Sequence, residues 1–201
     1  MLLALLLLQA APQTAVDAER AFYRAAQTKG QWTAFREFAA PDAIIFTPEP
    51  ARAQEVLPAK NPAVAVQWWP ADSYVSCDGA LAVNTGPWVR PKGAGFFTTV
   101  WQKQADGSWK WLVDGGDVLA KPRSLPETPR VHRAACKGEA PGPNMPFAPD
   151  GSQSAQGISP DRTLRWAWHV RKDGSRTFTA ELWNGRTNEV VVNDEIAADK
   201  S

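Results

Sequence analysis

Residues 95 to 117 read GFFTTVWQKQADGSWKWLVDGGD. Two runs rich in β-branched and aromatic residues flank Asp106-Gly107, a dipeptide that favours a tight turn between antiparallel strands. A tryptophan stands on each side of this turn, at Trp101 and Trp109. The stretch therefore predicts a β-hairpin, and this hairpin is the strongest indication of the fold.

The length of the turn decides which residues of the hairpin face each other. A two-residue loop places Trp101 opposite Leu112, whereas a three-residue loop over residues 105–107, with Gly107 left-handed, places Trp101 opposite Trp111. We favour the three-residue loop. Side chains of a strand alternate between its faces. One face then holds Phe97, Trp101, Trp109, Trp111 and Val113, and the other holds Phe96, Thr98, Val100, Leu112 and Asp114.

Asp114 is the candidate catalytic residue. The expected register places it opposite Thr98, on a face with Phe96, Val100 and Leu112. A carboxyl group among apolar side chains has a raised pKa, which suits proton transfer. The alternative is an acid near a strand end that is solvated or hydrogen-bonded and has no catalytic role.

The residues around the hairpin indicate an α+β fold, with N-terminal helices packed in a curved antiparallel sheet. Apolar residues at helical spacing predict a first helix over residues 16–28, and a second short helix follows from residue 31. The alternating and β-branched runs predict strands over 42–46, 64–69, 72–77, 81–90, 95–104 and 109–115.

Several short motifs follow one another in an order that resembles the nuclear transport factor 2-like superfamily. They are Phe35-x-x-Phe38-Ala39-x-x-Asp42-Ala43, Thr85-Gly86-Pro87-Trp88, Thr99-Val100-Trp101 and Asp106-Gly107-Ser108-Trp109-Lys110. The likeness covers residues 17 to 117 and is nearest to exported SnoaL-like or ketosteroid-isomerase-like branches without assigned activity. It implies a cone-shaped domain with an apolar cavity between the helices and the concave face of the sheet.

The resemblance also implies which residues line this cavity. The expected lining residues are Phe22, Tyr23, Phe35, Phe38, Phe96, Thr98, Val100 and Leu112. In ketosteroid-isomerase relatives a second acid and a tyrosine act together inside the cone. This chain offers only Tyr23 and Tyr74 for the tyrosine. Members of the superfamily include isomerases, cyclases, dehydratases and pure binding domains, so the fold does not name one reaction.

The composition changes after the cone domain, which we place at residues 16–120. Residues 121–160 are rich in proline, glycine and serine, and they predict an irregular connection. Residues 161–197 predict a three-stranded meander with one apolar face, which must cover another surface. We expect it to pack on the cone of the same chain, against the Phe97, Trp101, Trp109 and Trp111 face, rather than on a second copy.

The first residues and the cysteines indicate export. Residues 1–15 predict a signal peptide with an apolar core over Leu2 to Leu8, too short for a permanent membrane anchor. Cys77 and Cys136 are the only cysteines, and an oxidising compartment favours a disulfide between them. Two free thiols are the alternative. We therefore expect a periplasmic or secreted protein.

Composition limits the partners. The net charge of +1 gives no field that would recruit nucleic acid. His132 and His169 stand far apart in the sequence, and no metal or cofactor motif accompanies them, so we expect no metal and no cofactor. The sequence thus predicts a monomer or homodimer that binds a small apolar molecule or serves in assembly, without catalysis. The alternative is a small cofactor-free isomerase, cyclase or dehydratase that uses Asp114 as general acid or base.

Overall fold

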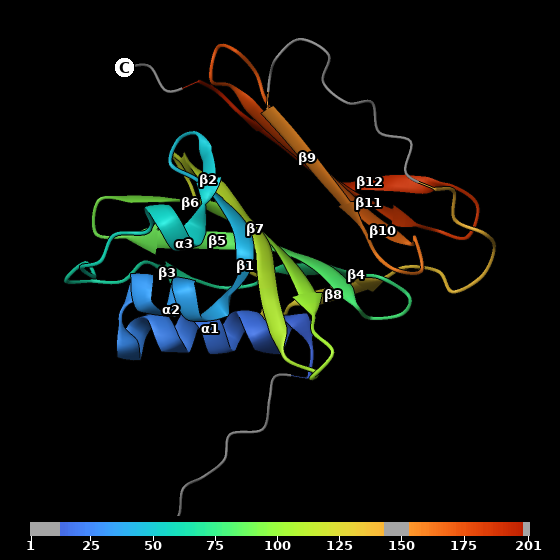
Figure 1. The fold of residues 1–201 in the computed structure, drawn as a ribbon, viewed down its shortest axis with the longest axis horizontal. Coiled ribbons are helices and arrows are strands. Elements are labelled where there is room, and N and C mark those ends of the chain that lie inside the picture. The colour runs from blue at the N-terminus through green and yellow to red at the C-terminus, as the bar shows by residue number, and fades with distance from the viewer. Residues whose placement is uncertain (1–12, 143–152, 199–201) are drawn as a thin grey trace, which may run out of the picture.

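The computed structural model of the chain describes residues 13–142 and 153–198. The predicted signal peptide lies mostly outside these residues. Three layers follow one another, namely two helices, a large curved sheet, and a second sheet on the far side of the first (Figure 1). The mixed α+β class that the sequence predicted is therefore present.

The helical layer consists of α1 (Ala15–Lys29) and α2 (Gln31–Phe38). Thr14 and Asp17 form a capping box that satisfies backbone N–H groups at the start of α1. Gly30, with φ of +102°, ends α1 and lets the chain turn directly into α2. The buried stripe of α1 is built from small residues and Phe22, which allows the helix to lie close to the sheet.

The large sheet has the strand order β2-β1-β7-β6-β5-β4-β8, with β3 paired to β5 and a short helix α3 (Ala53–Val56) after β2. Its strands are β1 (Ala39–Phe46), β2 (Pro50–Arg52), β3 (Gln67–Trp68), β4 (Asp72–Val75), β5 (Leu81–Arg90), β6 (Gly93–Lys103), β7 (Trp109–Leu119) and β8 (Arg130–Arg133). The sheet was predicted to be antiparallel, but β1 pairs with β7, and β4 with β8, in parallel. Turn residues indicate only hairpin neighbours, so these two long-range pairings left no local signal.

The β6–β7 hairpin confirms the three-residue loop. Trp101 pairs with Trp111, and Gly107 has a φ of +82°. One expectation is wrong, because a bulge at Leu112 shifts the register, so that Val100 pairs with Val113 and Thr99 pairs with Asp114. An extra residue in one strand exchanges the faces of all residues beyond it. Asp114 therefore shares the inner face with Trp111, and Val113 faces outward.

Glycine allows the sheet to curve around the helices. Gly86 and Gly116 flank Phe97 in one row across β5, β6 and β7. A Cβ atom on Gly86 would lie 2.0 Å from the carbonyl oxygen of Trp69, and one on Gly116 would lie 2.0 Å from that of Phe96. Only glycine permits these close backbone approaches, which bend the sheet into the wall of the cone.

The second sheet contains four antiparallel strands, where three were predicted: β9 (Gln153–Ile158), β10 (Leu164–Val170), β11 (Arg176–Trp183) and β12 (Asn188–Ile196). The missed strand, β9, lies at the edge of this sheet and reads QSAQGI. Its sequence shows no apolar alternation. The strand is held by backbone pairing with β10, and none of its side chains is fully buried. The short β8 also falls in the segment that was predicted to be irregular.

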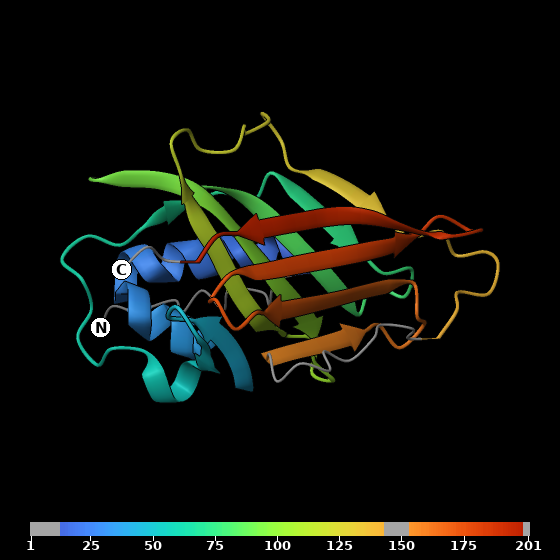
Figure 2. The same cartoon turned by 90° about the horizontal axis from the view of Figure 1, so that it is seen from above.

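The second sheet packs on the same chain, as expected, and its strands cross those of the large sheet obliquely (Figure 2). The expected counter-surface is wrong. Trp101, Trp109 and Trp111 pack against the helices, and the second sheet instead covers Val83, Val100 and Val113. The residues that meet these valines include Leu164, Trp166, Trp168, Phe178 and Ala180.

A disulfide joins Cys77 and Cys136, which confirms the predicted pair. It ties the segment after β8 to the turn between β4 and β5. The same segment is held to the second sheet, because Ala135 N donates to Trp183 O (2.8 Å) and Trp183 Nε1 donates to Lys137 O (2.8 Å). Among the described residues, no helix is long and apolar enough to cross a membrane.

Candidate functional site

A cavity of about 360 Å³ opens between the helices and the concave face of the large sheet. Its size lies within the range of small-molecule sites. Most of its wall is aromatic or aliphatic, supplied by Phe22 and Phe35 from the helices and by Trp68, Trp88 and Phe97 from the sheet. The cavity thus occupies the place that the cone shape implied.

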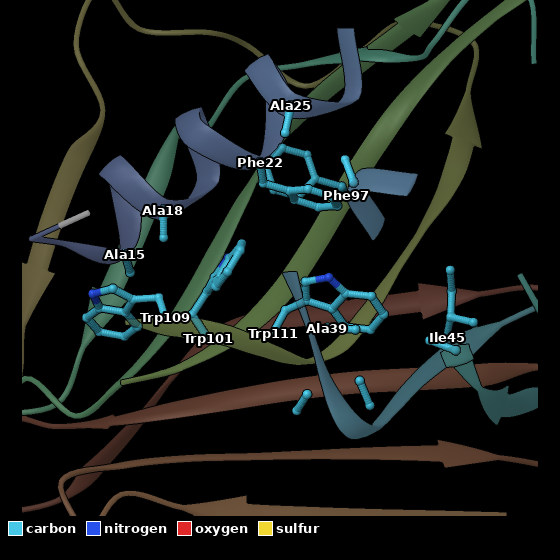
Figure 3. Packing of buried hydrophobic residues seen from close by; sticks show 14 of the residues in the cluster. Ala15, Ala18, Phe22, Ala25, Ala39, Ile45, Phe97, Trp101, Trp109 and Trp111 are labelled. Carbon is cyan, nitrogen blue, oxygen red and sulfur yellow. The ribbon is translucent and has the colours of Figure 1, made fainter. Parts of the chain in front are cut away.

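Ring contacts fix the aromatic wall. Phe22 packs against Phe35 with ring centroids 4.7 Å apart and against Trp68 at 4.9 Å, both edge to face. Figure 3 shows Phe22 and Ala25 extending from α1 into the layer that Phe97 and Trp101 enter from the sheet. Such contacts hold each ring in one orientation, so the wall is preformed.

Asp114 is the carboxyl group inside this largely apolar wall. It lines the cavity and retains some exposure, yet protein atoms surround its carboxyl group. Thr99 Oγ1, on the neighbouring strand, donates a 2.7 Å hydrogen bond to Asp114 Oδ2. Burial raises the pKa of Asp114 to about 7; the hydrogen bond lowers it and the nearby Glu19 carboxylate raises it. The carboxyl group can therefore take up or release a proton near neutral pH.

Glu19 is a second buried acid that the sequence interpretation did not single out as a site residue. It lies on α1 with no exposed surface. Its carboxylate accepts hydrogen bonds from Trp68 Nε1 (2.8 Å), Trp101 Nε1 (2.6 Å) and Asn84 Nδ2 (3.2 Å). Burial outweighs these bonds and raises the pKa of Glu19 to about 7. Its position three residues before Phe22, on the apolar stripe, was the signal that could have revealed it.

The opening of the cavity carries charge. Arg90, at the end of β5, and Asp117, on β7, both line it. Arg176 also lines it and comes from β11, so the second sheet completes the wall. Its Nη2 donates to Gly116 O at 2.8 Å, and its guanidinium lies 5.0 Å from the ring centroid of Phe46.

The structure brings together only part of the predicted cavity lining. Phe22 and Phe35 line the cavity, while Tyr23 and Phe38 pack at the margin of the same cluster. The remaining four predicted residues, Phe96, Thr98, Val100 and Leu112, do not line the cavity.

Phe96, Thr98 and Val100 share the face of β6 that points away from the helices. Val100 packs toward the second sheet, and Thr98 Oγ1 donates to Asp194 Oδ2 of β12 at 2.6 Å. Leu112, at the bulge, touches both clusters. Arg123 lies over the ring of Phe96, 3.8 Å from its centroid. The hairpin turns the opposite face to the cavity from the one expected, because Trp101, Trp109 and Trp111 pack against the helices. The bulge then turns Asp114 to that same inner face.

The tyrosines do not supply an evident partner for Asp114. Tyr23 packs its ring edge-on against Trp68, 5.4 Å between centroids. Tyr74 stacks on His132 at 4.8 Å, away from the cavity residues. Among the described residues, no group of three or more His, Cys, Asp or Glu side chains stands ready to hold a metal ion.

No family model and no curated protein matches the chain. Solved structures that align with about half of the chain include nuclear transport factor 2-like and ketosteroid-isomerase-like proteins. A predicted ketosteroid isomerase from Shewanella frigidimarina is 20% identical and aligns over 52% of this chain and 95% of its own, with a TM-score of 0.39. A nuclear transport factor 2-like superfamily protein from Salmonella enterica is 15% identical and aligns over 56% of this chain and 93% of its own, with a TM-score of 0.40.

Proposed function

We propose that the cone domain binds a small, largely apolar molecule in its cavity. The observation that carries this proposal is the preformed aromatic wall around a cavity of about 360 Å³. Inside this wall lies the carboxyl group of Asp114, which accepts a hydrogen bond from Thr99. Cavities of this kind bind ligands through their apolar surface and orient them through a few polar groups. Asp114 would orient the ligand through a hydrogen bond, as donor when protonated and as acceptor when ionised.

A binding role accounts for the structure better than a role in assembly. An assembly module presents an apolar face to its partner. Here the outer face of the large sheet, with Val83, Val100 and Val113, is already covered by the second sheet of the same chain. We also propose that the protein is exported, which the Cys77–Cys136 disulfide supports because such bonds persist in oxidising compartments.

Proton transfer by Asp114 is the second candidate function, and the raised pKa of this residue favours it. A carboxyl group with a pKa of about 7 next to an apolar cavity can remove a proton from carbon beside a carbonyl group and return it elsewhere. This is the chemistry of an isomerase, cyclase or dehydratase. Deuterium uptake by an apolar ketone distinguishes an Asp114 that only orients the ligand from one that also transfers its protons.

Binding is tested with N-phenylnaphthylamine, an uncharged aromatic probe whose fluorescence rises in apolar surroundings. Val66→Trp should fill part of the cavity that Val66 lines, and it should weaken probe binding at least about tenfold. The matched control is Val64→Trp, since Val64 stands two residues away, is 60% exposed and does not line the cavity. Equal binding by both variants would refute the proposal.

Proton transfer is tested by deuterium uptake. An apolar ketone incubated in heavy water with the protein should exchange hydrogen beside its carbonyl group faster than in buffer alone. Asp114→Asn keeps the size of the side chain and its acceptor for Thr99, but it removes the titrating proton. Exchange that Asp114→Asn abolishes supports catalysis, while probe binding without any exchange supports a binding domain.

A further inference from the structure

The polar groups at the opening of the cavity differ from the apolar wall inside it. Two guanidinium groups lie there, and each rests against an aromatic ring of the lining. Arg90 stands 5.2 Å from the centroid of Trp88, and Arg176 stands 5.0 Å from that of Phe46.

The acids near this entrance do not cancel the positive charge. Asp117 opposes one of the two guanidinium groups. Asp114 stands beside it in the wall, and its pKa of about 7 keeps it largely neutral in mildly acidic solution. Glu19 does not line the cavity. Among the residues that line the cavity, Arg90 and Arg176 then face the single carboxylate of Asp117, so these four side chains together carry one positive charge when Asp114 is protonated.

Arg90 is suited to bind an anion. The Arg90 guanidinium lies over the Trp88 ring, and its N–H donors suit a carboxylate or sulfonate group. Arg90 is exposed, so a ligand group can reach it without entering the core. Arg176 donates to Gly116 O and Pro48 O, and these bonds hold its charge in a fixed position at the wall.

We propose that the ligand is amphipathic, with an apolar body inside the cone and an anionic group, such as a carboxylate or sulfonate, at the entrance beside Arg90 and in the field of Arg176. This inference rests on the proposed function, because it names the class of molecule that the same cavity takes. It also gives the second sheet a part in recognition, since Arg176 belongs to β11.

The test uses two probes with the same ring system. Anilinonaphthalene sulfonate carries an anionic group that N-phenylnaphthylamine lacks. We expect the sulfonate to bind at least about threefold more tightly at low salt, and Arg90→Gln to remove this preference while leaving the uncharged probe unaffected. Lys92→Gln is the control, because it removes one positive charge from the same hairpin but Lys92 does not line the cavity.

The outcomes separate the two proposals. If neither probe binds in the cavity, the proposed function fails and this inference with it. If both bind with equal affinity, or if Lys92→Gln acts as strongly as Arg90→Gln, the cavity is an apolar site and the amphipathic ligand is refuted. Sulfonate binding that survives Val66→Trp lies outside the cavity and also refutes it.

Discussion

Thr99 and Asp114 face each other across β6 and β7, and the Thr99 hydroxyl donates a 2.7 Å hydrogen bond to the Asp114 carboxylate. The bulge at Leu112 produces this pairing. Without it, Asp114 would lie on the outer face of the sheet. One additional residue in β7 therefore turns Asp114 inward, beside an apolar cavity.

Thr99→Val tests what this hydrogen bond does. The bond stabilises the charged form of Asp114, so its loss should raise the pKa of Asp114 further above its ordinary value. The measurement is a carboxyl titration by NMR. Thr98→Val is the matched control, because Thr98 bonds to Asp194 on the opposite face and its loss should leave the titration of Asp114 unchanged. A lower pKa of Asp114 in Thr99→Val would contradict the geometry.

The two buried acids should make the protein less stable as the pH rises. The folded-state pKa of Glu19 is about 7 and its ordinary value is 4.5, so between these values the unfolded chain releases a proton that the folded chain keeps. The contribution to stability is full below about pH 4.5 and is lost as the pH rises toward 7. Its size is at most about 3.5 kcal/mol for Glu19, since one pKa unit corresponds to about 1.4 kcal/mol.

Glu19→Gln should therefore flatten the loss of stability between pH 4.5 and 7, as measured by urea unfolding. The side chain stays neutral at every pH. Its amide nitrogen replaces an oxygen that accepts from a tryptophan N–H, so the variant should be less stable overall while its stability depends less on pH. Glu37→Gln, in the exposed ion pair with Lys29, serves as control and should leave the slope unchanged. A variant with the wild-type slope would show that Glu19 does not titrate in this range.

The disulfide should contribute to stability through the length of the loop it closes. Cys77 and Cys136 are 59 residues apart, and the chain-entropy relation gives about 4 kcal/mol for a loop of this size. Replacing both cysteines by alanine should lower the urea midpoint accordingly. Mass analysis of the unreduced protein should find no alkylatable thiol. Two alkylated thiols in the unreduced protein would contradict the bridge.

Local patterns predicted the elements that depend on neighbouring residues. The spacing on α1, the three-residue loop before Trp109 and the pairing of Trp101 with Trp111 are all confirmed. Each depends on turn chemistry or periodicity within about ten residues of sequence. The disulfide was predicted from the compartment and an even cysteine count, which do not depend on the fold.

The features that were missed depend on contacts between distant parts of the chain. A bulge at Leu112 has no residue signature, because either strand can absorb an additional residue. Arg176 is far from the cone in sequence, and only the packing of the second sheet brings it to the cavity. Glu19 was not singled out, since nothing local shows that tryptophan N–H groups from two strands converge on it.

Asp194 offers a test of how the second sheet is held to the cone. This aspartate is almost fully buried, pairs with Arg123, and accepts from Thr98 Oγ1. Arg123→Gln should destabilise the protein by about 2 kcal/mol, because it leaves a buried carboxylate without its cation, and the partial exposure of Arg123 reduces the cost. Adding Asp194→Asn should restore part of this loss, since no unpaired charge then remains.

The control is Lys29→Gln, in an exposed pair, which should cost less than about 0.5 kcal/mol. Equal midpoints for Arg123→Gln and Lys29→Gln in urea would show that the Arg123–Asp194 pair does not hold the sheets together.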